Sequence, residues 1–358
     1  MRNVSKTSTT GRVNAGALTR RQLLTGARDR RPVRQTQLAA DDWIRVTRSA
    51  MACRFEIVAP SGNDPENNQG FEAAQSCLDE IDRLESVLSI FRPTSEVSAV
   101  NRAAAKLPVA VGPELFGLLQ QCQSLHRKTD GAFDVTTAAL SQCWGFSNRK
   151  PTIPTPDALE QARCSAGFQH VVLGDDQTVA FGVSGASINF GGIGKGFALD
   201  QGAAKLRAHN IDNALLSAGH SSILAVGDGP WGTGWLVSLR HPLFKNRTLG
   251  SVRLRSCALG TSGQEEQWFE ADGQRFGHIL DPRSGLPAKG VLSVTVIVDS
   301  ATCADALATA FLVGGPELAE RYCAAQPGTA AVILLERDPS LPLVIGSHDR
   351  AELEVLRG

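Results

Sequence analysis

A glycine-rich turn is the first segment whose residue types could carry chemistry. It reads Asn189-Phe190-Gly191-Gly192-Ile193-Gly194-Lys195-Gly196 and leads into an expected helix. Backbone N–H groups at a helix N-terminus bind anions, and glycine lets a phosphate approach the backbone closely. The spacing differs from a P-loop, in which Ser or Thr follows the lysine, and from the dinucleotide fingerprint. The turn is therefore either a phosphate site with Lys195 as its cation or simply a tight turn.

Asp305 and Thr309 lie four residues apart in another expected helix. This spacing places a carboxylate and a hydroxyl on one helical face. Both supply oxygen ligands that suit Mg²⁺, which keeps water and phosphate as its other ligands. The alternative is that both residues are structural: the helix dipole favours Asp305 near the helix N-terminus, and the Thr309 hydroxyl donates a hydrogen bond to a carbonyl of the preceding turn.

A possible acid–base pair occurs where His278 precedes Asp281 by three residues, just ahead of a proline-containing turn. Histidine titrates near neutral pH, so His278 could take a proton from an attacking hydroxyl while Asp281 orients the ring. The alternative is a hydrogen-bonded histidine in a strand, followed by an ordinary Asp-Pro turn.

Two further polar segments could line a ligand without identifying its chemistry. One is TDGAFDVT at 129–136, which contains Gly131, Ala132 and Phe133 and is followed by WGF at 144–146. The other is Thr261-Ser262-Gly263, which we expect to form a small loop after a strand.

Both helices and strands are expected to position these segments. Apolar residues recur at three- and four-residue steps over 71–88 and 113–128, which predicts amphipathic helices. Further helices are expected over 194–209, 302–313 and 316–325. Strands are expected over 54–59, 214–217, 223–227, 235–239, 251–258, 266–271, 274–279, 291–298 and 329–335, with a hairpin turn at Asp272-Gly273. Because no regular βαβ alternation is present, the sequence predicts an α+β fold with mostly antiparallel sheets.

Charge is distributed unevenly along the 358 residues, although 36 basic and 36 acidic side chains cancel overall. Residues 1–40 contain nine Lys or Arg and one acid, which predicts a solvated, disordered basic tail. Residues 41–358 contain 27 basic and 35 acidic residues and form the expected folded body, of one or two subdomains. A negatively charged body would repel the phosphate backbone of a nucleic acid, so nucleic-acid binding is not expected.

Targeting signals are weak in this sequence. Residues 19–24, TRRQLL, are similar to the start of a twin-arginine export signal, but the apolar run that should follow is missing. No stretch approaches the ~18 apolar residues that span a bilayer. These observations favour a cytoplasmic location. The eight cysteines lie at least 20 residues apart, which argues against a CxxC zinc or redox pair.

Taken in chain order, these segments resemble the ApbE family of FAD:protein FMN transferases. The resemblance covers about residues 45–335. Its landmarks are Met51, SIFRPTSEVSAVN at 89–101, TDGAFDVT at 129–136 with WGF at 144–146, INFGGIGKGFALD at 188–200, SAGHSSILAVG at 217–227, GTSG at 260–263, HILDPRSGLP at 278–287 and ADALATAF at 304–311. Eight blocks in the family's order are far more specific than any one of them.

The resemblance implies a T-fold-like α+β protein that binds FAD and Mg²⁺. Such enzymes cleave the FAD pyrophosphate, release AMP and attach FMN to a Thr or Ser hydroxyl of a target flavoprotein. By matching position, the metal ligands would be the Gly192 carbonyl, Asp305 and Thr309, and His278 would be the base with Asp281 beside it. The cofactor contacts would be Met51, Phe91, Gly131, Ala132, Phe133, Asn189, Lys195, Thr261, Ser262, Gly263, His278 and Ile279.

Several positions depart from the family pattern. Asn189 stands where Asp is common, Phe91 where Tyr is usual, and Gly219-His220 where the family has Gly-Gly. Glu265 and Gln267 replace a Tyr and an Arg, and the family's export signal, which would place the protein in the periplasm, is not evident. Two alternatives to FMN transfer therefore stay open: a metal-dependent FAD pyrophosphatase that uses water, and a flavin-binding protein without turnover.

Overall fold

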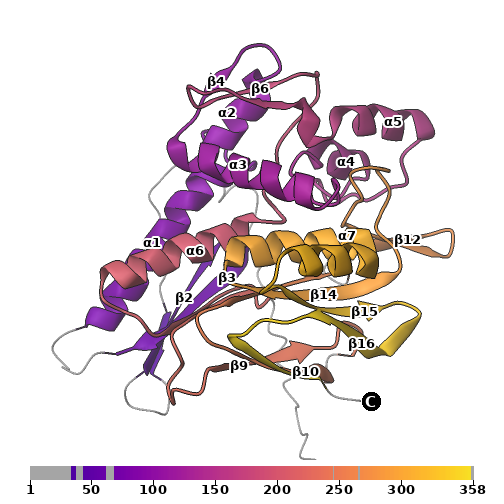
Figure 1. Ribbon diagram of the computed structural model, residues 1–358. Helices are drawn as coiled ribbons and strands as arrows, with labels where there is room; N and C mark the ends of the chain where they lie inside the picture. The colour runs from indigo at the N-terminus through magenta and orange to yellow at the C-terminus, as the bar shows by residue number, and fades with distance from the viewer. Residues whose placement is uncertain (1–33, 38–42, 62–67, 245, 265–266, 356–358) are drawn as a thin grey trace, which may run out of the picture. The chain divides into compact units, whose positions relative to one another are not determined.

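The computed structural model describes residues 34–37, 43–61, 68–244, 246–264 and 267–355. Within them, one sheet of nine strands has the order β1-β2-β3-β7-β8-β11-β14-β15-β16, and every neighbouring pair is antiparallel (Figure 1). Its strands are β1 (Arg34–Gln37), β2 (Trp43–Ala50), β3 (Cys53–Pro60), β7 (Ala214–Ala218), β8 (Ser222–Val226), β11 (Ala258–Gly263), β14 (Val291–Val298), β15 (Ala330–Leu335) and β16 (Asp338–Gly346).

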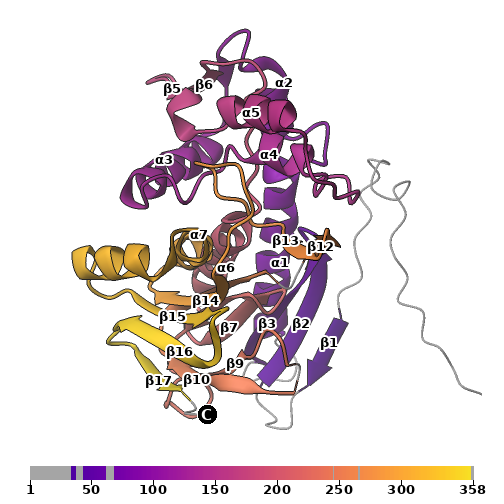
Figure 2. The same cartoon turned by 90° about the vertical axis from the view of Figure 1, so that its right-hand side faces the viewer.

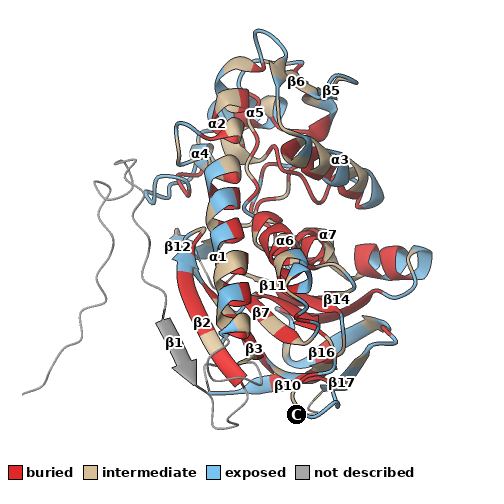
Figure 3. Ribbon diagram, turned by 90° about the vertical axis from the view of Figure 1, so that its left-hand side faces the viewer, coloured by how far each residue is buried: buried red, intermediate tan, exposed pale blue. Residues whose placement is uncertain are grey.

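Three long helices cover one face of this sheet: α1 (Gln69–Leu88), α6 (Gly194–Ala208) and α7 (Ala301–Ala325) (Figures 1 and 2). The apolar stripe of α1 is fully buried at Leu78 and Ile81, as its periodicity predicts. Figure 3 shows the buried residues concentrated where α6 and α7 lie on the sheet. Close approach of α7 to β11 requires a glycine, because a Cβ on Gly260 would lie 2.5 Å from the backbone of Ala304.

A second sheet packs on the opposite face of the large one. It has the order β17-β10-β9 and consists of β9 (Trp235–Arg240), β10 (Thr248–Leu254) and β17 (Ala351–Val355). The core between the two sheets contains Trp43 and Trp235, whose rings meet edge to face with centroids 5.4 Å apart. The indole N–H of Trp235 donates to the Val226 carbonyl, so this buried polar group is satisfied.

Shorter elements lie beyond α6 and α7, on the side away from the large sheet (Figure 2). They are α2 (Glu96–Ala103), α3 (Pro113–Lys128), α4 (Ala138–Cys143), α5 (Pro156–Ser165), a 3₁₀ turn (Phe168–His170) and a three-stranded sheet of β4 (Val109–Ala110), β5 (Val171–Leu173) and β6 (Thr178–Phe181). A separate hairpin, β12 (Trp268–Ala271) with β13 (Gln274–Gly277), packs Phe269 and Phe276 against Trp144.

The predicted α+β class with mostly antiparallel sheets is confirmed, and so are the helices expected over 71–88 and 113–128. The hairpin at Asp272-Gly273 is also present, with both residues at positive φ. The two helices expected over 302–313 and 316–325 form the single element α7, which has a break at Gly315, where φ is 72°.

Three expectations about element boundaries are wrong. Thr261-Ser262-Gly263 is not a loop, because it completes β11 and pairs with β14. His278 lies just after β13 and not within it. Residues 34–37, which fall in the range assigned to the tail, form β1 at the edge of the large sheet and pair with β2 along one side. The rest of 1–40 lies outside the described residues.

All eight cysteines are free thiols, and burial raises the pKa of Cys77 and Cys122. Among the described residues, none of the helices combines the length and hydrophobicity needed to span a bilayer.

Candidate active site

Asp305 on α7 is the buried carboxylate on which three elements converge. Its side chain is only 4% exposed. Oδ1 accepts a hydrogen bond of 2.8 Å from Ser222 Oγ on β8, and Oδ2 accepts one of 3.1 Å from the backbone N–H of Gly196 on α6. The ammonium of Lys195 lies 3.4 Å from Oδ1. A charge this deeply buried is stable only with such partners.

Asp200 holds the two helices that meet at this carboxylate. It lies on α6 and accepts hydrogen bonds from the first residues of α7: the backbone N–H groups of Ala301 and Thr302, at 3.0 and 2.9 Å, and the hydroxyls of Ser300 and Thr302, at 2.7 and 2.6 Å. These contacts satisfy the unpaired N–H groups at the start of α7. They fix the position of α6, which carries Lys195, relative to α7, which carries Asp305.

Gly196→Ala should separate the two helices and lower stability. A Cβ on Gly196 would lie 2.0 Å from the Ala301 carbonyl oxygen, so the backbone would have to move, at a cost of about 1–3 kcal/mol. Thermal denaturation measures the loss. The matched control is Gly117→Ala in α3, where no atom lies within 4 Å of the added Cβ and alanine favours the helix by up to about 1 kcal/mol. Equal melting temperatures for the two variants would contradict this account of α6–α7 packing.

The predicted metal ligands Gly192, Asp305 and Thr309 lie in one region of the structure. Thr309 is one turn after Asp305 on α7, and its hydroxyl lies 3.1 Å from that of Ser262 on β11. A Cβ on Gly192 would lie 3.4 Å from the same Thr309 hydroxyl, so the glycine turn passes directly over it. The Thr309 hydroxyl also lies 3.4 Å from the Asp305 carbonyl oxygen in the preceding turn. This is the hydrogen bond expected if Thr309 has only a structural role.

These donors fit a magnesium ion. Carboxylate, hydroxyl and carbonyl oxygens are hard ligands of the kind Mg²⁺ prefers, and it commonly keeps waters and substrate phosphates as the remainder of its shell. No group of three or more His, Cys, Asp or Glu side chains that could hold a metal occurs within the described residues. Asp305 is the one carboxylate among the predicted ligands, so water and phosphate oxygens would supply the rest of the coordination shell.

Met51 and Arg92, the residue after Phe91, both bind Glu85 at the C-terminal end of α1. Met51 begins the β2–β3 turn with φ at 47°, and its backbone N–H donates to Glu85 Oε1 over 3.0 Å. Arg92, next to Phe91, donates to Glu85 Oε2 over 2.7 Å. Phe91 is 68% exposed, which leaves it accessible to a ligand ring.

The segment 131–133 and Asn189 mainly shape the glycine turn. Ala132 and Phe133 are buried, and a Cβ on Gly192 would lie 3.7 Å from the Phe133 ring. Asn189 Oδ1 accepts a hydrogen bond of 3.0 Å from the Gly191 N–H. Because the side chain of Asn189 is engaged inside the turn, it positions the backbone that faces Thr309.

His278 is oriented by a backbone carbonyl. Its Nδ1 lies 3.1 Å from the Gln267 carbonyl oxygen, which also accepts the His278 backbone N–H. A carbonyl can only accept, so Nδ1 carries the hydrogen and Nε2 is the basic nitrogen of the neutral ring. The Phe146 ring packs near the imidazole, with centroids 6.5 Å apart.

Asp281 is engaged with Arg283. Its carboxylate accepts hydrogen bonds from the Arg283 backbone N–H, Nε and Nη2 at 2.9, 2.8 and 2.9 Å. Its own N–H and C=O bond to Leu286 and Gly285. These contacts support a role for Asp281 in shaping the turn after His278, and its predicted catalytic role stays a prediction. The Gln267 carbonyl, which sequence reasoning missed, performs the orienting.

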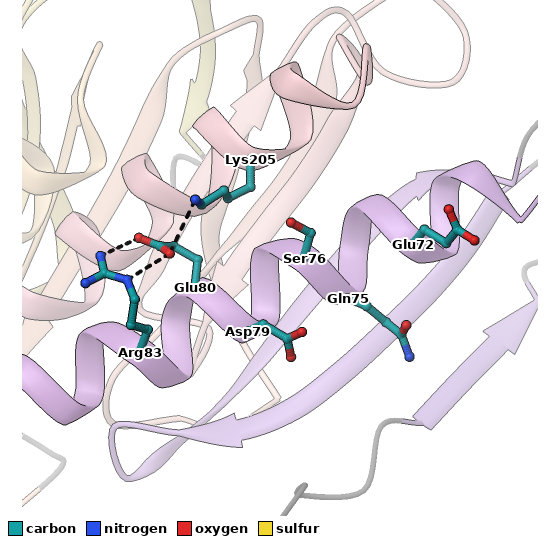
Figure 4. A pocket seen from close by; sticks show the side chains of 7 residues that line it. All are labelled: Glu72, Gln75, Ser76, Asp79, Glu80, Arg83 and Lys205. Atoms are coloured by element: carbon teal, nitrogen blue, oxygen red, sulfur yellow. Dashed lines mark hydrogen bonds and ion pairs between the residues drawn. The ribbon is translucent and has the colours of Figure 1, made fainter.

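A pocket of about 420 Å³ along α1 contains none of the predicted site residues. It is lined by Glu72, Gln75, Ser76, Asp79, Glu80, Arg83 and Lys205 (Figure 4). Glu80 pairs with both Arg83 and Lys205, at 2.6 and 3.5 Å, and the hydrogen bond from Arg83 holds the pKa of Glu80 below its ordinary value. Because Glu80, Arg83 and Lys205 are paired with one another and none of the predicted site residues lines this pocket, we assign it no part in the reaction.

Comparison with known proteins identifies the family. Residues 51–334 match the model of the ApbE family. The chain belongs to the ApbE family. The FAD:protein FMN transferase of Treponema pallidum is 34% identical over 266 residues, which cover 70% of this chain and 73% of that protein.

Two solved ApbE structures share the fold. The ApbE protein of Thermotoga maritima has a TM-score of 0.76 and 29% identity, covering 85% of this chain and 97% of that one. The apo flavinyl transferase ApbE of Pseudomonas stutzeri has a TM-score of 0.75 and 25% identity, covering 87% of this chain and 95% of that one. The fold expected from the resemblance is thereby confirmed.

One departure of this ApbE chain lies beside the candidate site. Gly219 and His220 form the turn between β7 and β8, with φ at 60° and 63°. The Ser221 carbonyl that follows accepts a hydrogen bond of 2.6 Å from the Thr261 N–H. His220 therefore adds an exposed imidazole next to the strand end where Thr261, Ser262 and Gly263 lie.

Proposed function

We propose that this chain transfers FMN from FAD to a Thr or Ser hydroxyl of an acceptor flavoprotein, with Mg²⁺ and with release of AMP. The observation that best supports this is the convergence of Lys195, Asp305 and Thr309 at the N-terminus of α6, within a chain of the ApbE family. Phosphoryl transfer depends mainly on positioning and charge stabilisation, which these groups supply.

Each residue has a distinct part in this reaction. Asp305, Thr309 and the Gly192 carbonyl would hold Mg²⁺, which when bound neutralises charge on the pyrophosphate. Lys195 and the N–H groups at the start of α6 stabilise the phosphate oxygens. His278 Nε2 takes the proton of the acceptor hydroxyl. The hydroxyl oxygen forms a bond to the FMN phosphorus, the pyrophosphate bond breaks, and AMP leaves with the electron pair.

Incubation with FAD and Mg²⁺, with and without a candidate acceptor flavoprotein, tests the proposal. AMP release and the mass of the acceptor are the two readouts. We expect AMP release that depends on the acceptor, together with FMN attached to it. Equal AMP release without any acceptor would instead assign the chain as an FAD pyrophosphatase. Binding of FAD without AMP release under either condition would assign a flavin-binding role only.

A further inference from the structure

The turn between β7 and β8 presents a histidine that is not among the predicted cofactor or metal contacts. Gly219 and His220 are its two central residues, and the Ser221 N–H donates to the Ala218 carbonyl across the turn over 3.3 Å. His220 is exposed. We infer that His220 is a further substrate-contact residue, whose imidazole binds a ring of FAD. The inference rests on the proposed function.

Strand pairing places this turn between two segments that are predicted to contact the cofactor. Because β3 and β7 are antiparallel, the start of β3 meets the end of β7, so the turn lies beside the β2–β3 turn that contains Met51. On the other side β8 pairs with β11, and the Ser221 carbonyl accepts the Thr261 N–H over 2.6 Å. His220 therefore lies between Met51 and Thr261 at one end of the large sheet.

The same end of the sheet meets the buried acid of the candidate site. Ser222, two residues after His220, donates to Asp305 Oδ1 over 2.8 Å. Two residues of chain span at most about 7 Å. The His220 backbone is therefore close to the group that would hold Mg²⁺ and the pyrophosphate of FAD, and its side chain extends from there into solvent.

The backbone of His220 has a conformation that glycine adopts at lower cost. Gly219 and His220 have φ of 60° and 63°, and a turn with positive φ at both central residues favours Asn-Gly because a Cβ is unfavourable there. Met51 and Ala52, in the neighbouring turn, also have positive φ, 47° and 60°. Residues held in such conformations cluster at ligand sites. A function of the imidazole would explain why this turn carries histidine where the family has glycine.

A ring of FAD suits the surroundings of this histidine. Met51 and Arg92, the residue after the exposed Phe91, both bind Glu85. A thioether and a phenyl ring favour contact with another planar ring. An imidazole offers a flat face for stacking and an N–H group for a hydrogen bond. In the part of the chain that the structure describes, no group forms a hydrogen bond or ion pair with the His220 ring, which leaves the ring available to a ligand.

Two substitutions at His220 separate the side chain from the backbone. His220→Gly removes both the ring and the unfavourable φ, so FAD should bind about three- to tenfold more weakly, as for one lost hydrogen bond, while the melting temperature rises by about 1–3 °C. His220→Ala removes the ring but keeps the Cβ, so FAD affinity should fall equally without that rise. Calorimetry of the full-length protein with FAD and Mg²⁺, without acceptor, measures the affinity, and thermal denaturation without ligand measures stability.

Calorimetry with FMN and with ADP then identifies the ring. A loss of affinity for FMN in His220→Gly assigns the isoalloxazine, and a loss of affinity for ADP assigns the adenine. Either result supports the inference.

Gln177→Gly is the matched control. Gln177 is exposed and has φ of 58° in the turn between β5 and β6, which contains none of the predicted site residues. Its replacement should raise the melting temperature in the same way and leave FAD affinity unchanged. Unchanged FAD affinity in both His220 variants would overturn the inference and leave FMN transfer intact. A His220→Gly variant that loses stability together with affinity would also overturn it, because the ring would then hold the turn. Failure of the wild-type protein to bind FAD would reject the proposed function itself.

Discussion

Asp305→Asn should nearly abolish FMN transfer while leaving the protein folded. Asparagine has the same shape, and its amide oxygen can still accept from the Gly196 N–H while its NH₂ group donates to Ser222 Oγ. The substitution removes the negative charge next to the predicted metal and, with it, the ion pair with Lys195. If the metal contributes several kcal/mol to transition-state stabilisation, the rate should fall by at least about 10²–10³. AMP release at fixed Mg²⁺, together with the melting temperature, measures both parts of this expectation.

Two control variants make this test specific. Asp305→Ala leaves the Gly196 N–H and the Ser222 hydroxyl without their buried acceptor, which costs about 1–3 kcal/mol for each group, so the melting temperature should fall as well. Asp200→Asn alters the acid that caps α7 outside the metal ligands, so it should lower stability more than the rate. If Asp305→Asn keeps more than a tenth of the wild-type rate, the carboxylate does not hold a metal required for the reaction.

His278→Ala should slow transfer by about 10²–10⁴, the usual contribution of a general base, without weakening the binding of FAD or Mg²⁺. The base acts only on the acceptor hydroxyl, so the effect should appear in the rate of transfer. Added imidazole should restore part of the rate, since it supplies the missing proton acceptor. A variant that keeps more than about a tenth of the wild-type rate would remove His278 from the mechanism. The contact with Gln267 would then describe a purely structural histidine.

Local sequence patterns predicted the helices well, because their signals lie within a few turns of chain. The spacing of Leu78, Ile81 and Leu84 on α1 is sufficient to identify its buried face. By contrast, Thr261-Ser262-Gly263 has no apolar alternation, and only pairing with β14 makes it a strand. A segment of this kind depends on its neighbours in the sheet, which no local pattern encodes.

The same limit applies to the site. Residue type and spacing indicate Asp305, Thr309 and His278, and the family resemblance adds the Gly192 carbonyl, but neither predicts the partners that hold these groups. Ser222 and Asp305 are 83 residues apart, and Gly196 and Asp305 are 109 apart. The Gln267 carbonyl that orients His278 is a backbone atom, so its side-chain identity carries no signal. Long-range contacts of this kind become visible only in the folded structure.

The hydrogen bonds that join Asp200 on α6 to the start of α7 also affect how the protein binds its ligands. The groups expected to bind nucleotide and metal are separated by more than a hundred residues, and they meet only after α6 and α7 have docked. A partly synthesised or partly folded chain therefore lacks the assembled site, and under the proposed function FAD and Mg²⁺ would bind the native state alone. Binding of that kind shifts the folding equilibrium by mass action, adding about 2.7 kcal/mol to the free energy of unfolding at a ligand concentration of 100 Kd. Under the proposed function, the free energy of unfolding would thus rise with the concentration of flavin.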